Sequence, residues 1–258
     1  MSDQNKSSRA YASNRTFQSM ARVKPVRSPL MREVVYTEER FQLLNSLRKE
    51  AVEIMVALEP EGTVPYLHGS VARGDVSAKS DIDVVILDAV PSYKVELALS
   101  NIGYDPEARY IAMATPSHAL KAIIELRDRV IVTFPLVKLR RLEREFYKFG
   151  GICSAGEAAS GKRNPGVDKR LMFIEPTDRG HRERSLLGHE AEVAKKLGIG
   201  IDLIKERERV LLRRDEVGRT GVYMKKRVPP DATVEEWADK VVGENQPASM
   251  KLRGKRRL

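Results

Sequence analysis

The fold is decided by the stretch Tyr66-Leu-His-Gly-Ser-Val-Ala-Arg-Gly-Asp-Val-Ser-Ala-Lys-Ser-Asp-Ile-Asp-Val-Val-Ile-Leu87, which joins a Gly-Ser turn to two aspartates. The apolar residues before the turn predict a short buried strand, and Gly69 and Ser70 then allow a tight turn whose backbone N–H groups can face a phosphate. Asp81 and Asp83 lie two residues apart in a second strand-like run, so both carboxylates should point to one side of it. Such acids repel each other unless a cation lies between them. The segment therefore predicts a Mg²⁺ site shared with a nucleoside triphosphate (NTP).

The Gly-Ser pair, ten intervening residues and Asp81-Ile-Asp83 resemble the signature of the DNA polymerase β-type nucleotidyltransferase superfamily. Ser70-Val-Ala-Arg-Gly74 together with Ser80-Asp-Ile-Asp83 is especially similar to its small prokaryotic members, including predicted archaeal ones. The resemblance implies an α/β (α+β) nucleotidyltransferase fold, with a mixed sheet flanked by helices. It also implies an enzyme that directs in-line attack of a hydroxyl on the α-phosphorus of an NTP and releases pyrophosphate.

The resemblance assigns roles to particular residues. Asp81 and Asp83 would be catalytic metal ligands, with Mg²⁺ as the cofactor and Mn²⁺ as an alternative. The residues expected to bind the nucleotide are Gly69, Ser70, Arg73 and Lys79. For the two basic residues in that set, an exposed and merely solvated side chain is an equally good interpretation.

Active members of the superfamily usually present a third carboxylate from a neighbouring strand. The next two strand-like runs contain no acid, although Glu107 and Asp128 directly precede them. Glu175 ends a later apolar run and is followed by Pro176, which suits a strand end. We therefore expect Glu175 to be the third catalytic carboxylate, while the absence of any third acid would favour a non-enzymatic protein.

Composition limits the partners. The 258 residues carry a net charge of +10, which favours a nucleic-acid partner over a basic surface that only aids solubility. The single cysteine, Cys153, excludes an internal disulfide and suits a reducing, cytoplasmic environment. No apolar run is long enough to predict a membrane span or a signal peptide.

The charge and periodicity patterns predict four segments. These are a basic disordered arm at 1–30, the nucleotidyltransferase domain at 31–180, a winged helix-turn-helix-like domain at 181–245 and a basic tail at 246–258. Within the second segment, Thr37 should cap a long helix that begins at Glu38. Residues 117–126 are predicted to be helical, and residues 150–166 are predicted to form a glycine-rich loop.

The winged helix-turn-helix prediction rests on residues 190–228. A first helix should end at Leu197, Gly198 should allow the bend, and a second helix should begin at Asp202 as its N-cap. Residues 219–228 would form the wing. Outward-facing basic residues expected to contact nucleic acid are Lys205, Arg209, Arg213, Arg219, Lys225 and Lys226. The alternative is a packing or dimerisation element of the same shape.

Taken together, the sequence predicts an Mg²⁺-dependent nucleotidyltransferase that uses an NTP and modifies a hydroxyl acceptor, with nucleic acid favoured as the acceptor. One alternative is a DNA- or RNA-binding regulator with a nucleotide-sensing or inactive domain. Another is a protein-modifying, antitoxin-like nucleotidyltransferase. The sequence does not specify the base of the NTP, the acceptor or the oligomeric state.

Overall fold

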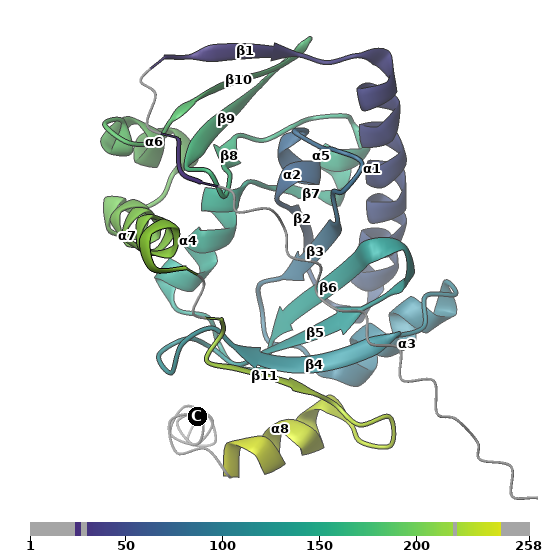
Figure 1. Cartoon of the computed structure of the whole chain (residues 1–258). Helices are drawn as coiled ribbons and strands as arrows, with labels where there is room; N and C mark the ends of the chain where they lie inside the picture. The colour runs from purple at the N-terminus through teal and green to yellow at the C-terminus, as the bar shows by residue number, and fades with distance from the viewer. Residues whose placement is uncertain (1–23, 27–29, 219–220, 244–258) are drawn as a thin grey trace, which may run out of the picture.

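A computed structural model describes residues 24–26, 30–218 and 221–243, which form two β-sheets with helices between and around them (Figure 1). The strands of the larger sheet are β2 (Pro65–His68), β3 (Ile82–Ile86), β4 (Ala108–Met113), β5 (Lys121–Glu125), β6 (Val130–Pro135), β7 (Ile152–Ser154) and β11 (Met224–Arg227). Those of the smaller sheet are β1 (Arg32–Val35), β8 (Gly166–Val167), β9 (Met172–Thr177) and β10 (Gly180–Ser185). In the described residues the strand orders are β11-β4-β5-β6-β3-β2-β7 and β1-β10-β9-β8. The larger sheet is mixed, as predicted, because β3 and β6 are parallel whereas the other pairs are antiparallel.

The helices are α1 (Glu38–Leu58), α2 (Ser70–Arg73), α3 (Ser92–Asn101), α4 (Arg141–Gly150), α5 (Ala155–Ala159), α6 (Glu190–Leu197), α7 (Ile201–Val217) and α8 (Val234–Gly243), with short 3₁₀ turns at Glu59–Glu61 and Arg127–Arg129. The prediction of α1 is confirmed. Thr37 is its N-cap, acidic residues fill its first turn, and Gly62 in the left-handed region (φ 73°) ends the following turn. None of the described helices combines the length and the apolar character needed to cross a membrane.

The main hydrophobic core lies between one face of the larger sheet and helices α1, α3 and α8. Along β3, Ile82, Val84 and Ile86 point into this core and are at most 1% exposed. Burying each such side chain stabilises the fold by about 1.5–3 kcal/mol. Because side chains alternate along a strand, this burial fixes Asp83 on the opposite face of the sheet.

A second core lies between the smaller sheet and helices α4, α6 and α7. Phe173 and Leu186, both fully buried, come from the sheet side, and Val193 and Ile204, also fully buried, come from α6 and α7. The helix pair and its bend at Gly198 are therefore present as predicted. Helix α7 begins at Ile201 with Gly200 as N-cap, however, rather than at the predicted Asp202.

A winged helix-turn-helix domain is not confirmed. The expected wing strand, β11, pairs antiparallel with β4 and forms an edge of the larger sheet. Met224 and Val228 then join the main core, together with Val234 and Val241. This pairing is favourable because β4 would otherwise be an edge strand with unpaired backbone N–H and C=O groups. Strand β11 forms hydrogen bonds with those groups, and the apolar residues Met224 and Val228 become buried.

Two other predicted segments differ from the structure. Residues 117–126 were predicted to be helical but contain β5, because pairing with β4 and β6 buries Ala122 and Ile124 on one face. The predicted loop 150–166 contains β7 and α5, and Ser154 caps α5 by accepting a hydrogen bond from the Glu157 N–H (3.2 Å).

The predicted tail at 246–258 lies outside the described residues, as does most of the predicted arm at 1–30. Val26, within the arm, donates its N–H to the Arg170 carbonyl (2.9 Å) and accepts from the Ser185 hydroxyl (2.8 Å). This part of the arm is therefore attached to the smaller sheet.

Candidate active site

The turn between β2 and α2 is shaped by glycine. Gly69 has φ 76°, a conformation that side chains rarely tolerate, and its N–H donates to the Gly151 carbonyl (2.9 Å). A Cβ atom placed on Gly69 would lie 3.7 Å from Asp83 Oδ2. The turn and the carboxylate are therefore neighbours, and the missing side chain leaves room for a ligand beside the carboxylate.

Asp81 and Asp83 lie at the start of β3, on the face of the sheet away from the main core. Burial, followed by the negative charge of Asp81, raises the pKa of Asp83 to about 6, while the charges of Lys169 and Arg73 oppose the rise. The two carboxylates are thus close enough to repel each other in a partly desolvated place. This is the arrangement that a bound cation would stabilise.

His68 is the register partner of Asp83 across the β2–β3 pair. Its ring packs edge-on against Tyr147, with centroids 5.3 Å apart, and its buried Nε2 forms no hydrogen bond within the described residues. Burial, aided by the charges of Arg73 and Lys121, lowers the pKa of His68 to about 3. A neutral imidazole therefore forms the wall beside the carboxylates.

Arg73, a predicted nucleotide-binding residue, is buried and held by hydrogen bonds within the protein. It is 6% exposed, and its guanidinium donates to the Gly150 carbonyl (2.5 Å) and to Asp75 Oδ2 (2.9 Å). The bond to Gly150 fastens the end of α2 to the end of α4, beside the glycine turn. The charge of the guanidinium also acts on Asp83.

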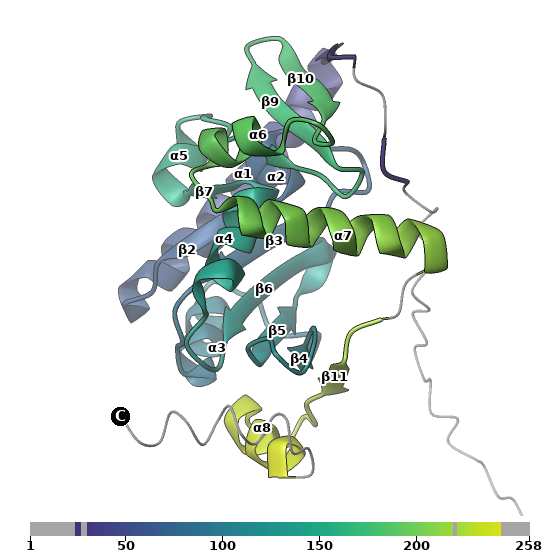
Figure 2. The same ribbon diagram turned by 90° about the vertical axis from the view of Figure 1, so that its left-hand side faces the viewer.

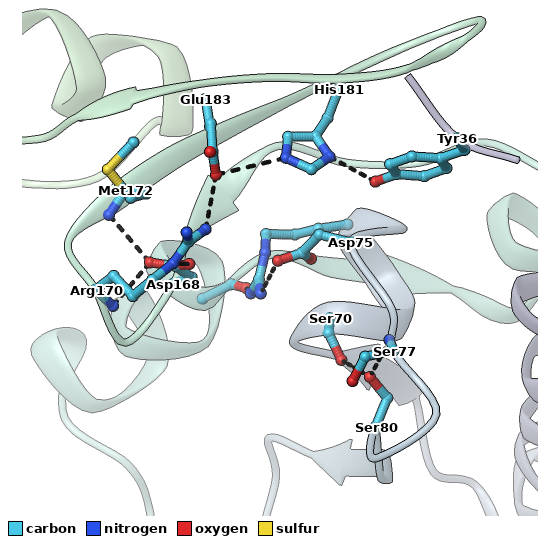
Figure 3. A network of polar contacts seen from close by, with 12 residues as sticks. Tyr36, Ser70, Asp75, Ser77, Ser80, Asp168, Arg170, Met172, His181 and Glu183 are labelled. Atoms are coloured by element: carbon cyan, nitrogen blue, oxygen red, sulfur yellow. Dashed lines mark hydrogen bonds and ion pairs between the residues drawn. The ribbon is translucent and has the colours of Figure 1, made fainter. Parts of the chain in front are cut away.

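Two further residues predicted to bind the nucleotide are Ser70, the first residue of α2, and Lys79, in the loop between α2 and β3. The Ser70 hydroxyl donates to Ser80 Oγ (3.2 Å), which also accepts from the Ser77 N–H (3.0 Å) (Figure 3). Lys79 is exposed on the same loop, with its N–H bonded to Ser77 Oγ (3.3 Å). The loop therefore orients Ser70 and leaves the Lys79 side chain in solvent.

The structure does not bring Glu175, the expected third carboxylate, to the aspartate pair. Glu175 lies on β9 of the smaller sheet and forms an ion pair with Lys196 of α6 (2.5 Å). It shares a strand face with Phe173, which is buried in the second core, so alternation directs both toward the helices. Among the described residues, no group of three or more His, Cys, Asp or Glu side chains is arranged to hold a metal ion.

A different acid, Glu125, lies on the same face and in the same row of the larger sheet as Asp83. Ile131 of β6 pairs with Asp83 on one side and with Glu125 of β5 on the other. The two acidic residues are thus separated by two strand spacings, roughly 9.6 Å at the backbone. Glu125 forms an ion pair with Lys225 (3.1 Å). Glu125 was missed because the sequence around β5 was predicted to be helical.

Lys169 is a second residue that sequence reasoning missed. It occupies the exposed turn between β8 and β9, and its charge acts on both Asp83 and His68. Asp168 stiffens this turn by accepting from the N–H groups of Arg170 (2.8 Å) and Met172 (3.0 Å). No sequence pattern reveals the turn, since β8 has only two residues.

The basic residues predicted to contact nucleic acid lie on two elements. Helix α7, which runs across the face shown in Figure 2, exposes Lys205, Arg209 and Arg213 to solvent. On β11, Lys226 is exposed, whereas Lys225 pairs with Glu125 and lies 4.0 Å from the centre of the Tyr110 ring. Arg219 lies outside the described residues.

Residues 48–150 match a family model described as a nucleotidyltransferase domain. The matched span includes β2, the glycine turn, the aspartate pair and the row that contains Glu125. Comparison with curated proteins and with solved structures found no significant match.

Proposed function

We propose that the nucleotidyltransferase domain at residues 48–150 transfers a nucleoside monophosphate from an NTP to a hydroxyl acceptor and releases pyrophosphate. The observation that carries this proposal is the approach of the Gly69 turn to Asp83 Oδ2, with Asp81 beside it. A glycine turn with backbone N–H groups beside two neighbouring carboxylates is what a metal-bound triphosphate requires.

The donor set fits Mg²⁺. This ion is commonly held by one or two carboxylates together with substrate phosphates and water. Asp81 and Asp83 therefore provide enough protein ligands to bind it. When bound, the ion supplies charge neutralisation on the phosphates and lowers the pKa of the attacking hydroxyl. The elevated pKa of Asp83 supports the assignment, because a cation there would offset the repulsion from Asp81.

The chain's own residues then orient the reactants. Gly69 leaves space for the triphosphate, and the Ser70 hydroxyl is held in place by the 77–80 loop. We assign Lys169 to the phosphates, since its positive charge already acts at Asp83. We also assign Glu125 as the third acidic group of the site, reached from the aspartates across Ile131.

The acceptor that the surface favours is a nucleic acid. Lys205, Arg209 and Arg213 recur every fourth residue along α7 and are all exposed, so one side of that helix carries a line of positive charge. The net charge of +10 has the same sign. Lys and Arg along a groove or helix gain affinity for a phosphate backbone by releasing its counterions.

The test is pyrophosphate release from each NTP, with and without Mg²⁺, in the presence of RNA, DNA or no acceptor. Wild-type protein should release pyrophosphate only with the metal, and Asp81→Ala/Asp83→Ala should not release it. Equal release by the folded double variant would disprove the assignment. Asp178→Ala, which removes an exposed acid of the β9–β10 turn, is the matched control.

A further inference from the structure

A second polar pocket lies at the other end of α2 from the aspartate pair. It has a volume of about 150 Å³ and lies between α1, the segment that follows α2 and the smaller sheet. Its charged and polar lining comes from Arg32, Arg40, Asp75, Arg170, His181 and Glu183. Because one water needs about 10–15 Å³ of such volume, the pocket has room for a small anion such as a single phosphoryl group.

The charges of the lining do not cancel. Glu183 pairs with Arg32 (3.4 Å) and Arg170 (2.7 Å), and Asp75 pairs with Arg73 (2.9 Å) behind the pocket wall. Arg40 has no carboxylate partner among the described residues, and its guanidinium instead lies 3.9 Å from the centre of the Tyr36 ring. One positive charge is therefore available to an anion.

Three buried polar atoms of this lining also form no hydrogen bond within the described residues. They are Arg40 Nε, His181 Nε2 and Asp75 Oδ1. Leaving such groups unpaired costs about 1–3 kcal/mol each, so their gathering at one pocket points to a ligand that pairs with them. His181 is only 3% exposed, which makes it a fixed wall of the pocket rather than a surface group.

The tautomer of His181 determines whether its ring is a hydrogen-bond donor or an acceptor toward the pocket. Burial raises the pKa of Tyr36 to about 12, so its hydroxyl keeps its proton, and this hydroxyl shares a hydrogen bond with His181 Nδ1 (2.6 Å). Burial lowers the pKa of His181, so the ring is neutral, and we assign its proton to Nε2 because the Glu183 carboxylate lies on that side, which makes Nδ1 the acceptor from Tyr36. The Glu183 carboxylate, 3.7 Å from Nε2, stabilises the proton there but is too distant for a hydrogen bond (Figure 3). His181 Nε2 and Arg40 Nε are therefore donors, and Asp75 Oδ1 is an acceptor.

We propose that this pocket binds a phosphoryl group that carries its own hydroxyl, either inorganic phosphate or a terminal phosphomonoester. The two donors would bind phosphate oxygens, and Asp75 Oδ1 would accept from the phosphate hydroxyl. Sulfate, which carries no proton at neutral pH, would place two negative charges against each other at Asp75. The pocket thus prefers phosphate to sulfate, and this preference does not depend on nucleotidyl transfer at the aspartates.

Calorimetric titration of the full chain in EDTA with inorganic phosphate and with sulfate tests the proposal. We expect saturable phosphate binding and sulfate binding at least about tenfold weaker, as one unpaired charged hydrogen bond predicts. Arg40→Gln should weaken phosphate binding about tenfold or more, and Asp75→Asn should narrow the phosphate preference by strengthening sulfate binding. Thermal unfolding of each variant establishes that it is folded. If Arg40→Gln does not fold, the proposal is tested by Asp75→Asn alone, in which the ratio of phosphate affinity to sulfate affinity should be smaller than in the wild type.

The Asp81→Ala/Asp83→Ala variant distinguishes phosphate binding in this pocket from binding at the aspartate pair. If the pocket is the site, the variant should bind phosphate as tightly as the wild type. A 5′-phosphorylated dinucleotide and its unphosphorylated form distinguish the sources of the phosphoryl group. Tighter binding of the phosphorylated dinucleotide than of free phosphate identifies a terminal phosphomonoester, and the reverse order identifies inorganic phosphate. Absent binding in the folded wild type, equal binding of sulfate, or loss of binding only in the double aspartate variant would each overturn the proposal.

Discussion

Asp83 and Glu125 lie in one row across the larger sheet, with only Ile131 of the intervening strand between them. Three adjacent strands thus bring two acids from distant parts of the chain to the same face of the sheet. Asp83 is held beside Asp81 and the glycine turn, whereas Glu125 is paired with Lys225 of the edge strand β11. Strand β11 therefore contributes a cation to the acidic row of the segment that matches the nucleotidyltransferase-domain model.

Glu125→Gln should lower the rate of nucleotidyl transfer by about 10–100-fold, the usual cost of removing an outer group of a metal site. Glu175→Gln is the matched control. It should leave the rate unchanged, because Glu175 lies on the smaller sheet and forms an ion pair with Lys196 of α6. Steady-state rates at saturating NTP and several Mg²⁺ concentrations provide the measurement. A lower rate in Glu175→Gln together with an unchanged rate in Glu125→Gln would identify Glu175, and not Glu125, as the third carboxylate.

Asp83→Asn should stabilise the metal-free protein at pH 7 while removing activity. The pKa of Asp83 is raised from 3.8 to about 6, so the folded state holds this proton more tightly than the unfolded chain. Stability therefore falls as pH rises through this window, by on the order of 3 kcal/mol in all. Asparagine does not ionise, so the Asp83→Asn variant should not lose this folding stability as the pH rises.

Urea unfolding at pH 3.5 and pH 7, in EDTA, measures the effect of Asp83→Asn. The gain in unfolding free energy should be present at pH 7 and close to zero at pH 3.5, where the aspartate is protonated in the folded state and mostly protonated in the unfolded chain. Asp178→Asn, at an exposed turn, should show no gain at either pH. A gain of equal size at both pH values would mean that charge repulsion is not its cause.

Lys169→Met should raise the KM for NTP several-fold with a smaller effect on kcat, because its charge acts beside Asp83 and the phosphates would lie there. Lys79→Met tests the other predicted phosphate contact in the same assay. Lys49→Met, at an exposed position of α1, is the control and should match wild type. An unchanged KM in Lys169→Met would remove this residue from the nucleotide site.

Charge reversal on α7 should weaken nucleic-acid binding. Arg209→Glu should reduce affinity for RNA or duplex DNA and lower the slope of log affinity against log salt by about 1 or more, since a phosphate contact is lost. Lys49→Glu changes the net charge equally from α1 and should leave the slope unaltered. Equal effects of both variants in fluorescence anisotropy would show that net charge, and not α7, determines binding.

The residues that could be predicted from the sequence are those whose local pattern and tertiary setting agree. The apolar stripe and acidic first turn of α1 are one example, and the Gly69 turn facing Asp83 is another. Position 125 could not be predicted, because residues 117–126 have a helix-like composition that pairing with two strands overrides.

Long-range pairing explains the other differences. The basic strand β11 follows a helix pair that resembles a helix-turn-helix, yet the open edge of β4 gives it a partner in another part of the chain. Arg73 has the sequence position of a phosphate ligand, but the carbonyl of Gly150, 77 residues away, takes its guanidinium. Neither partner is visible in a local window of sequence.

The fate of the phosphates tests the central claim most directly. Parallel reactions with α-³²P- and γ-³²P-labelled NTP, Mg²⁺ and RNA should transfer the α label to the acceptor and release the γ label as pyrophosphate, and Asp81→Ala/Asp83→Ala should do neither. Transfer of the γ label, or transfer of the α label that persists in the folded double variant, would contradict nucleotidyl transfer at these aspartates.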